Sequence, residues 1–371
     1  MLFLVKLTEL KHNIFFLFIA IFIFSCTENS SNNNQSLYNS NYTSLSNSKK
    51  IEYLDSIEKN IPSKNDSLKL KVLFEIAAEY YYLNKNESSF KTSKKIFKTS
   101  KSINDSISMG RALYYMGDCY ESFLKDSAYY FYKESEKIFR LIKNDEKTAK
   151  ALFNKAHLLF TEGNYIESEV EVIKALQKIK NSKNYELLYS CYYLQASNHT
   201  ELEELEKALE YLDLALSNLE KVNSTSVNYN KYSEYKALVI VAICNIYDKK
   251  GDFNKSIEEL EKIEINSLYR KNPLIFSTVT GNLAYANMKI GNYKKSLNYY
   301  NKSLDAIKSS EVDKNYLFKI INLGEYNLLV HDTINANKYF NEALFLSKKL
   351  KSGREVLRTL KFLSISDKGK D

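Results

Sequence analysis

The chain has 371 residues, a formal net charge of +8 at pH 7 and a charged fraction of 26%. Its 2 prolines and 9 glycines are too few for an all-β protein, which needs turn-forming residues after every short strand, so the composition favours helices joined by short turns. Only five of the 53 basic residues are arginines, and the lysines alternate with glutamates. We therefore expect a solvated, ion-paired surface and no nucleic-acid partner.

The N-terminus is typical of an export signal. A short basic region precedes residues 14–24, which are all apolar but too few to cross a bilayer as a helix. The tetrapeptide Ile23-Phe24-Ser25-Cys26 then resembles the lipobox of bacterial lipoproteins, with an aliphatic residue three before the cysteine and a small residue directly before it. The resemblance implies cleavage before Cys26 and acylation of its thiol. The alternative is an ordinary signal peptide with a cysteine nearby.

Residues 27–50 are rich in Ser and Asn and carry almost no aliphatic side chains. Such a segment cannot bury enough apolar surface to offset the entropy of ordering, so a disordered tether is predicted. We expect three parts in the chain: a lipoprotein signal peptide over 1–25, the acylated cysteine and tether over 26–50, and a repeat domain over 51–371.

Three turns in the body of the chain share the sequence Gly, Asn or Asp, then Tyr or Phe, and they begin at Gly163, Gly251 and Gly291. Helical patterns lie on both sides of each turn, with apolar residues at spacings of three and four. A helix–turn–helix unit recurring at about 40 residues indicates a repeat fold. The pattern resembles the tetratricopeptide repeat, in which a small residue lies midway along the first helix, Gly-x-Tyr marks the turn, and small residues recur on the second helix.

Seven units fit this frame, each with small residues where two closely packed helices would cross. The first-helix positions are Ala77, Gly117, Ala156, Ala196, Cys244, Ala284 and Gly324. The positions that open the second helix are Ser89, Ala128, Ser168, Ala208, Ser256, Ser296 and Ala336. This second series recurs every 39 or 40 residues except for one interval of 48. The extra eight residues are predicted to form a polar loop at residues 221–230.

The resemblance implies an all-α fold: a right-handed α-solenoid of about seven helix pairs of the tetratricopeptide type, covering roughly residues 65–350. Residues 354–365 then show one more amphipathic pattern. Repeat arrays need a terminal element over the last apolar face, so this segment is predicted to be a capping helix.

No constellation indicates catalysis or metal binding. Cys119, Cys191 and Cys244 fall at packing positions of different repeats, and we expect buried thiols there. The histidines are scattered, and the sequence has no phosphate-binding loop, nucleophile elbow or dinucleotide fingerprint. We predict no enzymatic activity, no metal, no cofactor and no small-molecule substrate.

An Asp-Ser or Asp-Thr pair precedes Ile, Leu or Ala five times, and its hydroxyl residues are Ser56, Ser67, Ser106, Ser127 and Thr333. The aspartates could cap helix N-termini, where a side-chain oxygen accepts an unpaired N–H. The pattern also resembles an O-glycosylation motif on exported proteins of one group of Gram-negative bacteria. Both interpretations can hold, because helix caps are exposed.

In the repeat family the first helices line a concave groove. The family's inner positions fall on Tyr81, Tyr114, Asn154, His157, Tyr193, Asn245, Asn282, Tyr285, Asn322 and Glu325. Asn can bond both donors and acceptors of an extended peptide, and Tyr offers contact area at low entropic cost. The alternative is a merely hydrated helix face. Some family members hold a C-terminal carboxylate with a Lys and an Asn; here Val241 occupies that Lys position beside Asn245, so this mechanism is not expected.

The sequence thus predicts a non-catalytic scaffold that binds a protein or peptide in the cell envelope, lipid-anchored in the outer membrane of a Gram-negative bacterium. One alternative is the extracytoplasmic sensory module of a split or truncated sensor kinase or transcription regulator. A less favoured one is a nutrient-binding lipoprotein of an uptake complex, against which the absence of Trp argues, since such proteins commonly stack sugars on Trp.

Overall fold

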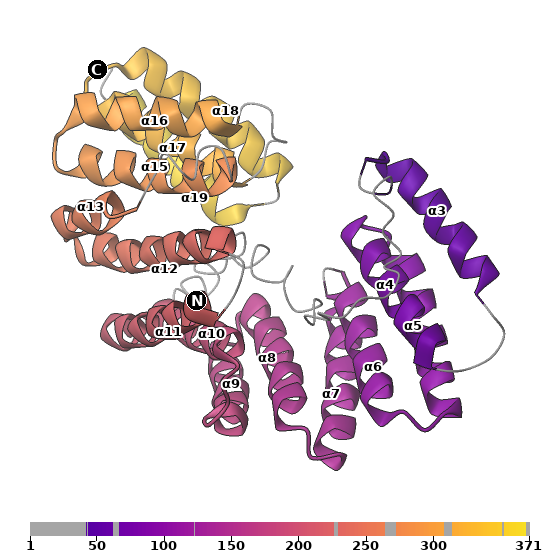
Figure 1. Ribbon diagram of the computed structural model, residues 1–371. Coiled ribbons are helices and arrows are strands. Elements are labelled where there is room, and N and C mark those ends of the chain that lie inside the picture. The colour runs from indigo at the N-terminus through magenta and orange to yellow at the C-terminus, as the bar shows by residue number, and fades with distance from the viewer. Residues whose placement is uncertain are drawn as a thin grey trace, which may run out of the picture. The chain divides into compact units, whose positions relative to one another are not determined.

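The computed structural model describes residues 42, 44–61, 67–121, 123–225, 229–263, 272–307, 314–350 and 352–368, and within them every regular element is a helix (Figure 1). The predicted signal peptide, Cys26 and most of the predicted tether lie outside these residues. None of the described helices is long and apolar enough to cross a membrane.

The described helices alternate in the order that a repeat of helix pairs requires. The first helices of the pairs are α4 (Ser67–Tyr82), α6 (Ser106–Tyr120), α8 (Asp145–Glu162), α10 (Tyr185–Glu201), α12 (Tyr229–Lys250), α15 (Pro273–Lys289) and α17 (Lys314–Leu329). The second helices are α5 (Asn86–Ser102), α7 (Lys125–Leu141), α9 (Tyr165–Ile179), α11 (Leu205–Thr225), α13 (Phe253–Glu261), α16 (Tyr293–Ile307) and α18 (Thr333–Lys349). The prediction of an all-α solenoid of such pairs is confirmed.

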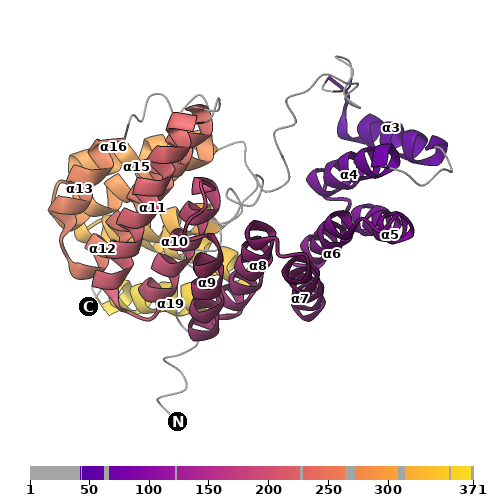
Figure 2. The same ribbon diagram turned by 60° about the horizontal axis from the view of Figure 1, so that its bottom comes forward.

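The chain divides into two compact units, with the boundary between Asn198 and His199 inside α10. We call the described residues up to 198 the N-terminal unit and those from 199 onward the C-terminal unit. Within the N-terminal unit, α4 packs on α5 and α6 packs on α7, as both ribbon views show (Figures 1 and 2). Within the C-terminal unit, α15 packs on α16 and α17 on α18.

The small residues of the repeat frame lie where the two helices of a pair meet, and all fourteen are buried. Two pairs are joined directly at these positions: Ser89 Oγ donates to the Ala77 carbonyl and Ser296 Oγ to the Ala284 carbonyl, both at 2.8 Å. At Gly117 a Cβ would lie 2.5 Å from the Tyr132 ring. The helices therefore approach too closely for bulk at these positions, as the sequence predicted.

The turn inside a pair reverses the chain through a residue in the left-handed region. Gly163, Gly251 and Gly291 have φ values of 79–81°, which glycine adopts without a Cβ penalty. The next residue's N–H then bonds the carbonyl five residues back, for example from Asn164 to Leu159 at 2.9 Å, which satisfies the helix C-terminus. The three glycine turns identified in the sequence are therefore the points where helix pairs close.

The predicted polar loop at residues 221–230 is wrong. Helix α11 continues to Thr225 and α12 begins at Tyr229, so these two helices, with 21 and 22 residues, take up most of the insertion. The segment contains no Gly or Pro, so its polar residues do not interrupt a helix. Polarity here marks exposure and not a loop.

Both ends of the described array carry an extra helix. Helix α19 (Gly353–Lys368) packs on α18, with the Phe362 and Phe340 rings stacked at 5.2 Å, which confirms the predicted cap. Helix α3 (Asn47–Asn60) precedes α4 and begins within the segment predicted as a tether, so that prediction is wrong for residues 47–50. The Ser46 side chain accepts a bond from the Lys49 N–H and caps this helix.

A buried ion cluster joins three helices of the N-terminal unit. The Lys155 ammonium on α8 lies 2.8 Å from a carboxylate oxygen of Glu136 on α7 and 2.8 Å from one of Glu171 on α9. All three side chains are nearly inaccessible to solvent. Because each buried carboxylate depends on this ammonium for compensation, the cluster holds α8 in register with both second helices.

Candidate functional site

Five of the predicted groove residues form a connected row across the C-terminal unit, which we call the polar ladder. Together with two residues that the sequence analysis did not select, its members are Asn245 on α12, Asn282, Tyr285 and Lys289 on α15, Asn322 and Glu325 on α17, and Arg358 on α19. The repeat period explains the row: equivalent positions 40 residues apart face the same way on successive first helices.

Hydrogen bonds run from one first helix to the next along the ladder. Asn282 Nδ2 donates to Asn245 Oδ1 at 3.1 Å, which links α15 to α12. Arg358 Nη2 donates to Asn322 Oδ1 at 2.7 Å, which links α19 to α17. Since one Asn can offer two N–H donors and an acceptor oxygen, each of these bonds uses only part of the amide's capacity.

A charged cluster lies at the α17 end of the ladder. The Glu325 carboxylate receives a hydrogen bond from Lys289 and one from Arg358, whose Nη2 is 3.4 Å away. The carboxylate is largely buried, whereas the Lys289 and Arg358 side chains remain 27% and 33% exposed. Two cations therefore share one anion, and this end of the ladder carries an excess of one positive charge that reaches solvent.

The lysine of this cluster also interacts with aromatic and acidic neighbours. Lys289 Nζ lies 5.1 Å from the centre of the Tyr285 ring. Burial disfavours its charge, but the Glu325 carboxylate and the Tyr285 side chain outweigh this effect and raise the lysine pKa. Burial raises the pKa of Asp248 on α12 to about 6, against the opposing effects of the Ser256 hydrogen bond and the Lys289 charge. Lys289 is thus held as a cation.

The ladder is accessible where it is richest in amides. Asn245 is exposed, and Asn282, Tyr285 and Asn322 are half-buried. An extended segment lying across α12, α15 and α17 would meet amide donors and acceptors, an aromatic ring and then a cationic end.

The predicted groove residues of the N-terminal unit have a different environment. Tyr81 is half-buried, but Tyr114, Asn154, His157 and Tyr193 are buried, with Asn154 and Tyr193 only 1% exposed. These four side chains pack inside the unit and do not form an open lining. Large aromatic neighbours cover the first-helix face here: the Tyr114 ring, for instance, lies 5.7 Å from that of Tyr132.

His157 belongs to a closed polar network between α6, α7 and α8. Its Nδ1 lies 2.8 Å from Glu121 Oε1, and Glu121 Oε2 accepts a bond from the Tyr132 hydroxyl at 3.2 Å. The same hydroxyl donates to Asp118 Oδ1 at 2.7 Å. Burial raises the pKa of Asp118 to about 8, although the bond from Tyr132 opposes the shift. The network is a structural polar core whose proton content depends on pH.

Helix capping accounts for two of the five Asp-Ser/Thr pairs. Asp105 accepts from the Ser108 N–H and Asp332 from the Asn335 N–H, both at 3.0 Å. The capping interpretation is wrong for Asp55, which lies inside α3 and accepts from the Tyr80 hydroxyl at 2.5 Å. It is also wrong for Asp126, which follows the first residue of α7. The fifth aspartate, at position 66, lies outside the described residues.

The hydroxyl residues of these pairs differ in accessibility. Ser56 and Ser67 are exposed, on α3 and at the start of α4. Ser106, Ser127 and Thr333 lie in the first turns of α6, α7 and α18 and are half-buried. O-glycosylation at these positions stays a prediction, with Ser56 and Ser67 the best-exposed acceptors.

The cysteines of the repeats are buried, as predicted. Burial raises the pKa of the Cys191 and Cys244 thiols to about 12, so both stay protonated at neutral pH. In the part of the chain that the structure describes, no group of three or more His, Cys, Asp or Glu side chains is placed to hold a metal ion.

Lys289 and Arg358 are the ladder residues that sequence reasoning missed. Neither recurs at the repeat period: the positions 40 residues from Lys289 are Lys249, which is exposed, and Leu329, while Arg358 lies on a helix interpreted only as a cap. Their one signal is a basic side chain on an otherwise amphipathic first helix or cap. A search confined to the family's inner positions cannot find them.

Comparison with known proteins supports the repeat fold. The tetratricopeptide repeat family matches residues 280–309, which contain most of α15 and all of α16. No curated protein matched the sequence. Among solved structures, a Rap protein complexed with competence and sporulation factor is similar with a TM-score of 0.53 and 15% identity, over 89% of this chain and 96% of that one.

Two further solved structures are similar at low identity. Aspartyl phosphate phosphatase F from Bacillus subtilis has a TM-score of 0.56 and 13% identity, over 89% of this chain and 90% of that one. A signal transduction ATPase with a tetratricopeptide repeat sensor from Pyrococcus horikoshii has a TM-score of 0.56 and 18% identity, over 74% of this chain and 42% of that one. These matches support a tetratricopeptide-repeat protein, and that fold supports a protein-interaction scaffold.

Proposed function

We propose that the chain is a non-catalytic scaffold, anchored by a lipid in the cell envelope, that binds an extended segment of a protein partner along the polar ladder. The observation that carries this proposal is the continuous row of amide, aromatic and cationic side chains from α12 to α19. The repeat fold supports it, because stacked first helices offer a long surface to an extended chain.

The ladder's own bonds leave groups that suit a peptide backbone. The bond between Asn282 and Asn245 uses one N–H of the first and the oxygen of the second, so Asn245 Nδ2 and Asn282 Oδ1 face the partner's needs. A backbone carbonyl would accept from the former and a backbone N–H would donate to the latter. At the other end, the excess cation of Lys289 and Arg358 favours a partner segment with an acidic side chain.

Anchoring is proposed from the lipobox-like sequence that ends at Cys26. A lipid anchor would raise the local concentration of the scaffold beside envelope partners without any new contact. The Rap protein among the similar structures is complexed with competence and sporulation factor, so this helical architecture does accommodate a bound factor. At 15% identity the comparison supports the architecture and leaves the partner to experiment.

The test is a crosslinking pull-down from intact membranes, followed by titration of the recovered partner. The wild-type chain is compared with the triple variant Asn245→Ala, Asn282→Ala, Asn322→Ala. Each partner group left unsatisfied in the interface costs about 1–3 kcal/mol, so one such loss weakens binding at least fivefold. Unchanged affinity in a variant that melts like the wild type would contradict the ladder as the site.

A sensory module is the second candidate. The signal transduction ATPase among the similar structures carries its tetratricopeptide repeats as a sensor. The pull-down separates the two functions, since a module of a split regulator would recover a kinase or a transcription regulator as its main crosslinked partner.

A further inference from the structure

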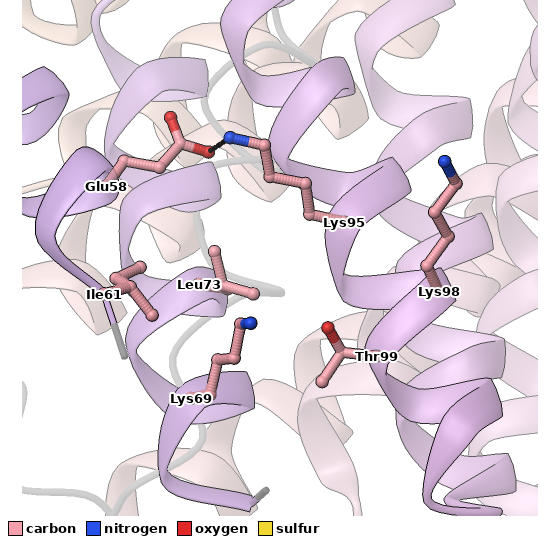
Figure 3. A pocket seen from close by; sticks show the side chains of 7 residues that line it. All are labelled: Glu58, Ile61, Lys69, Leu73, Lys95, Lys98 and Thr99. Carbon is pink, nitrogen blue, oxygen red and sulfur yellow. Dashed lines mark hydrogen bonds and ion pairs between the residues drawn. The ribbon is translucent and has the colours of Figure 1, made fainter. Parts of the chain in front are cut away.

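A cavity lies between α3, α4 and α5 of the N-terminal unit, away from the polar ladder. Its volume is about 340 Å³, within the range of small-ligand sites. It is lined by Glu58, Ile61, Lys69, Leu73, Lys95, Lys98 and Thr99 (Figure 3). We call it the lysine cavity.

The lysine cavity has an apolar floor and a basic rim. Leu73 and Thr99 are 1% and 4% exposed and form the floor together with Ile61. Lys69 rises from α4 on one side, and Lys98 stands on α5 on the other (Figure 3). Lys95 and Lys98 are exposed, so the rim opens to solvent. A ligand with an apolar body and an anionic group would meet matching surfaces.

The one acidic side chain of the lining is already bonded. Glu58 Oε1 accepts from Lys95 Nζ at 2.9 Å and from the Thr92 hydroxyl at 2.8 Å. The glutamate therefore compensates one lysine, while Lys69 and Lys98 face each other across the floor (Figure 3). Three lysines and one glutamate leave an excess of two positive charges.

The second helix extends this positive field. Lys91, Lys94, Lys95 and Lys98 follow one face of α5 at spacings of three and four, and they line an adjoining hollow of about 340 Å³ with Asp55, Glu58, Tyr80 and Ser88. Like charges held on one face raise the local potential and concentrate anions there.

We propose that the lysine cavity binds a phosphomonoester. Such a group carries about −1.5 to −2 charges at neutral pH and three acceptor oxygens, which match two excess ammonium groups and the Thr99 hydroxyl. A single carboxylate supplies half that charge. The organic part of the ligand would rest on Leu73 and Ile61. A free phosphomonoester and a lipid headgroup that ends in a phosphomonoester offer the same chemistry.

Phenyl phosphate is the probe that tests this proposal, titrated calorimetrically into the full chain. We expect saturable binding of one molecule. Lys69→Gln and Lys98→Gln should each weaken it about tenfold, since each removes one charge-assisted bond. Lys101→Gln is the matched control, because this lysine is exposed on α5 but lines neither hollow, and it should change affinity less than twofold.

Vesicles distinguish the two sources of the phosphate. If the natural ligand is a lipid, vesicles with phosphomonoester headgroups should bind the full chain more tightly than zwitterionic vesicles, and Lys98→Gln should remove the difference. If it is a free compound, phenyl phosphate should bind and the two vesicle types should behave alike. The proposal is overturned if neither probe binds in a Lys98-dependent way, or if Lys101→Gln weakens binding as much as Lys98→Gln does.

Discussion

Replacing Gly324 with alanine should destabilise the C-terminal unit even though alanine is the better helix former. Gly324 lies in the middle of α17, where a Cβ would overlap the Phe340 ring of α18. The intrinsic gain of about 1 kcal/mol from removing a helical glycine is then opposed by overpacking, which costs about 1–3 kcal/mol and rises with the overlap. Because the ring is fully buried and cannot swing away, we expect a net loss of about 1–2 kcal/mol.

Gly281→Ala is the matched control, in α15 of the same unit. Its Cβ would lie 3.3 Å from Ser303 Oγ and 3.4 Å from Lys319 Cε, contacts that a small shift relieves. Its effect should stay within about 1 kcal/mol in either direction. Urea denaturation followed by circular dichroism at 222 nm measures both. If Gly324→Ala is as stable as the wild type, or Gly281→Ala is the more damaging of the two, the close helix crossing at Gly324 is wrong.

Three further predictions test other parts of the chain. The pKa of Asp118 is about 8 in the folded state and near 3.8 when unfolded, so the folded state binds the extra proton, and wild-type stability should fall relative to Asp118→Asn as pH rises from 4 to 8 in thermal melts. Lys155→Met should cost about 3 kcal/mol or more in urea because it leaves two buried glutamates uncompensated, whereas Lys174→Met, at a half-exposed lysine, should cost less than about 1 kcal/mol. Cys26→Ala should abolish fatty-acid labelling in cells, and equal labelling of both proteins would contradict anchoring.

The repeat fold was predictable because its main requirement is written locally in the sequence. A small residue at each helix crossing and a regular interval between such residues define the helix pairs, whatever the remaining side chains are. The turns were only partly predictable. Where glycine occupies the left-handed position the sequence shows it, but Asn84, Glu203 and His331 adopt φ values of 57–63° in equivalent turns. The adjoining helices impose that conformation there, and no residue type announces it.

The candidate site was predictable in position but not in accessibility. The family's inner positions give the correct face of each first helix in both units. Whether that face is open depends on the neighbouring side chains, and these do not repeat. Around Asn154 and Tyr193 large side chains close over the face, whereas around Asn282 and Asn322 it stays partly open. Accessibility is therefore a property of packing between repeats and cannot be read from one repeat alone.

The capping helix links the stability of the array to the chemistry of the proposed site. Phe362 on α19 stacks on Phe340 and covers the last helix pair, while Arg358 on the same helix reaches back to Asn322 and Glu325 on α17. Without Arg358, Lys289 and Glu325 would neutralise each other, and the charged end of the ladder would lose its excess cation. One helix thus both terminates the described repeats and sets the charge of the surface that we propose as the docking site. Changes to the cap should therefore be judged on binding as well as on folding.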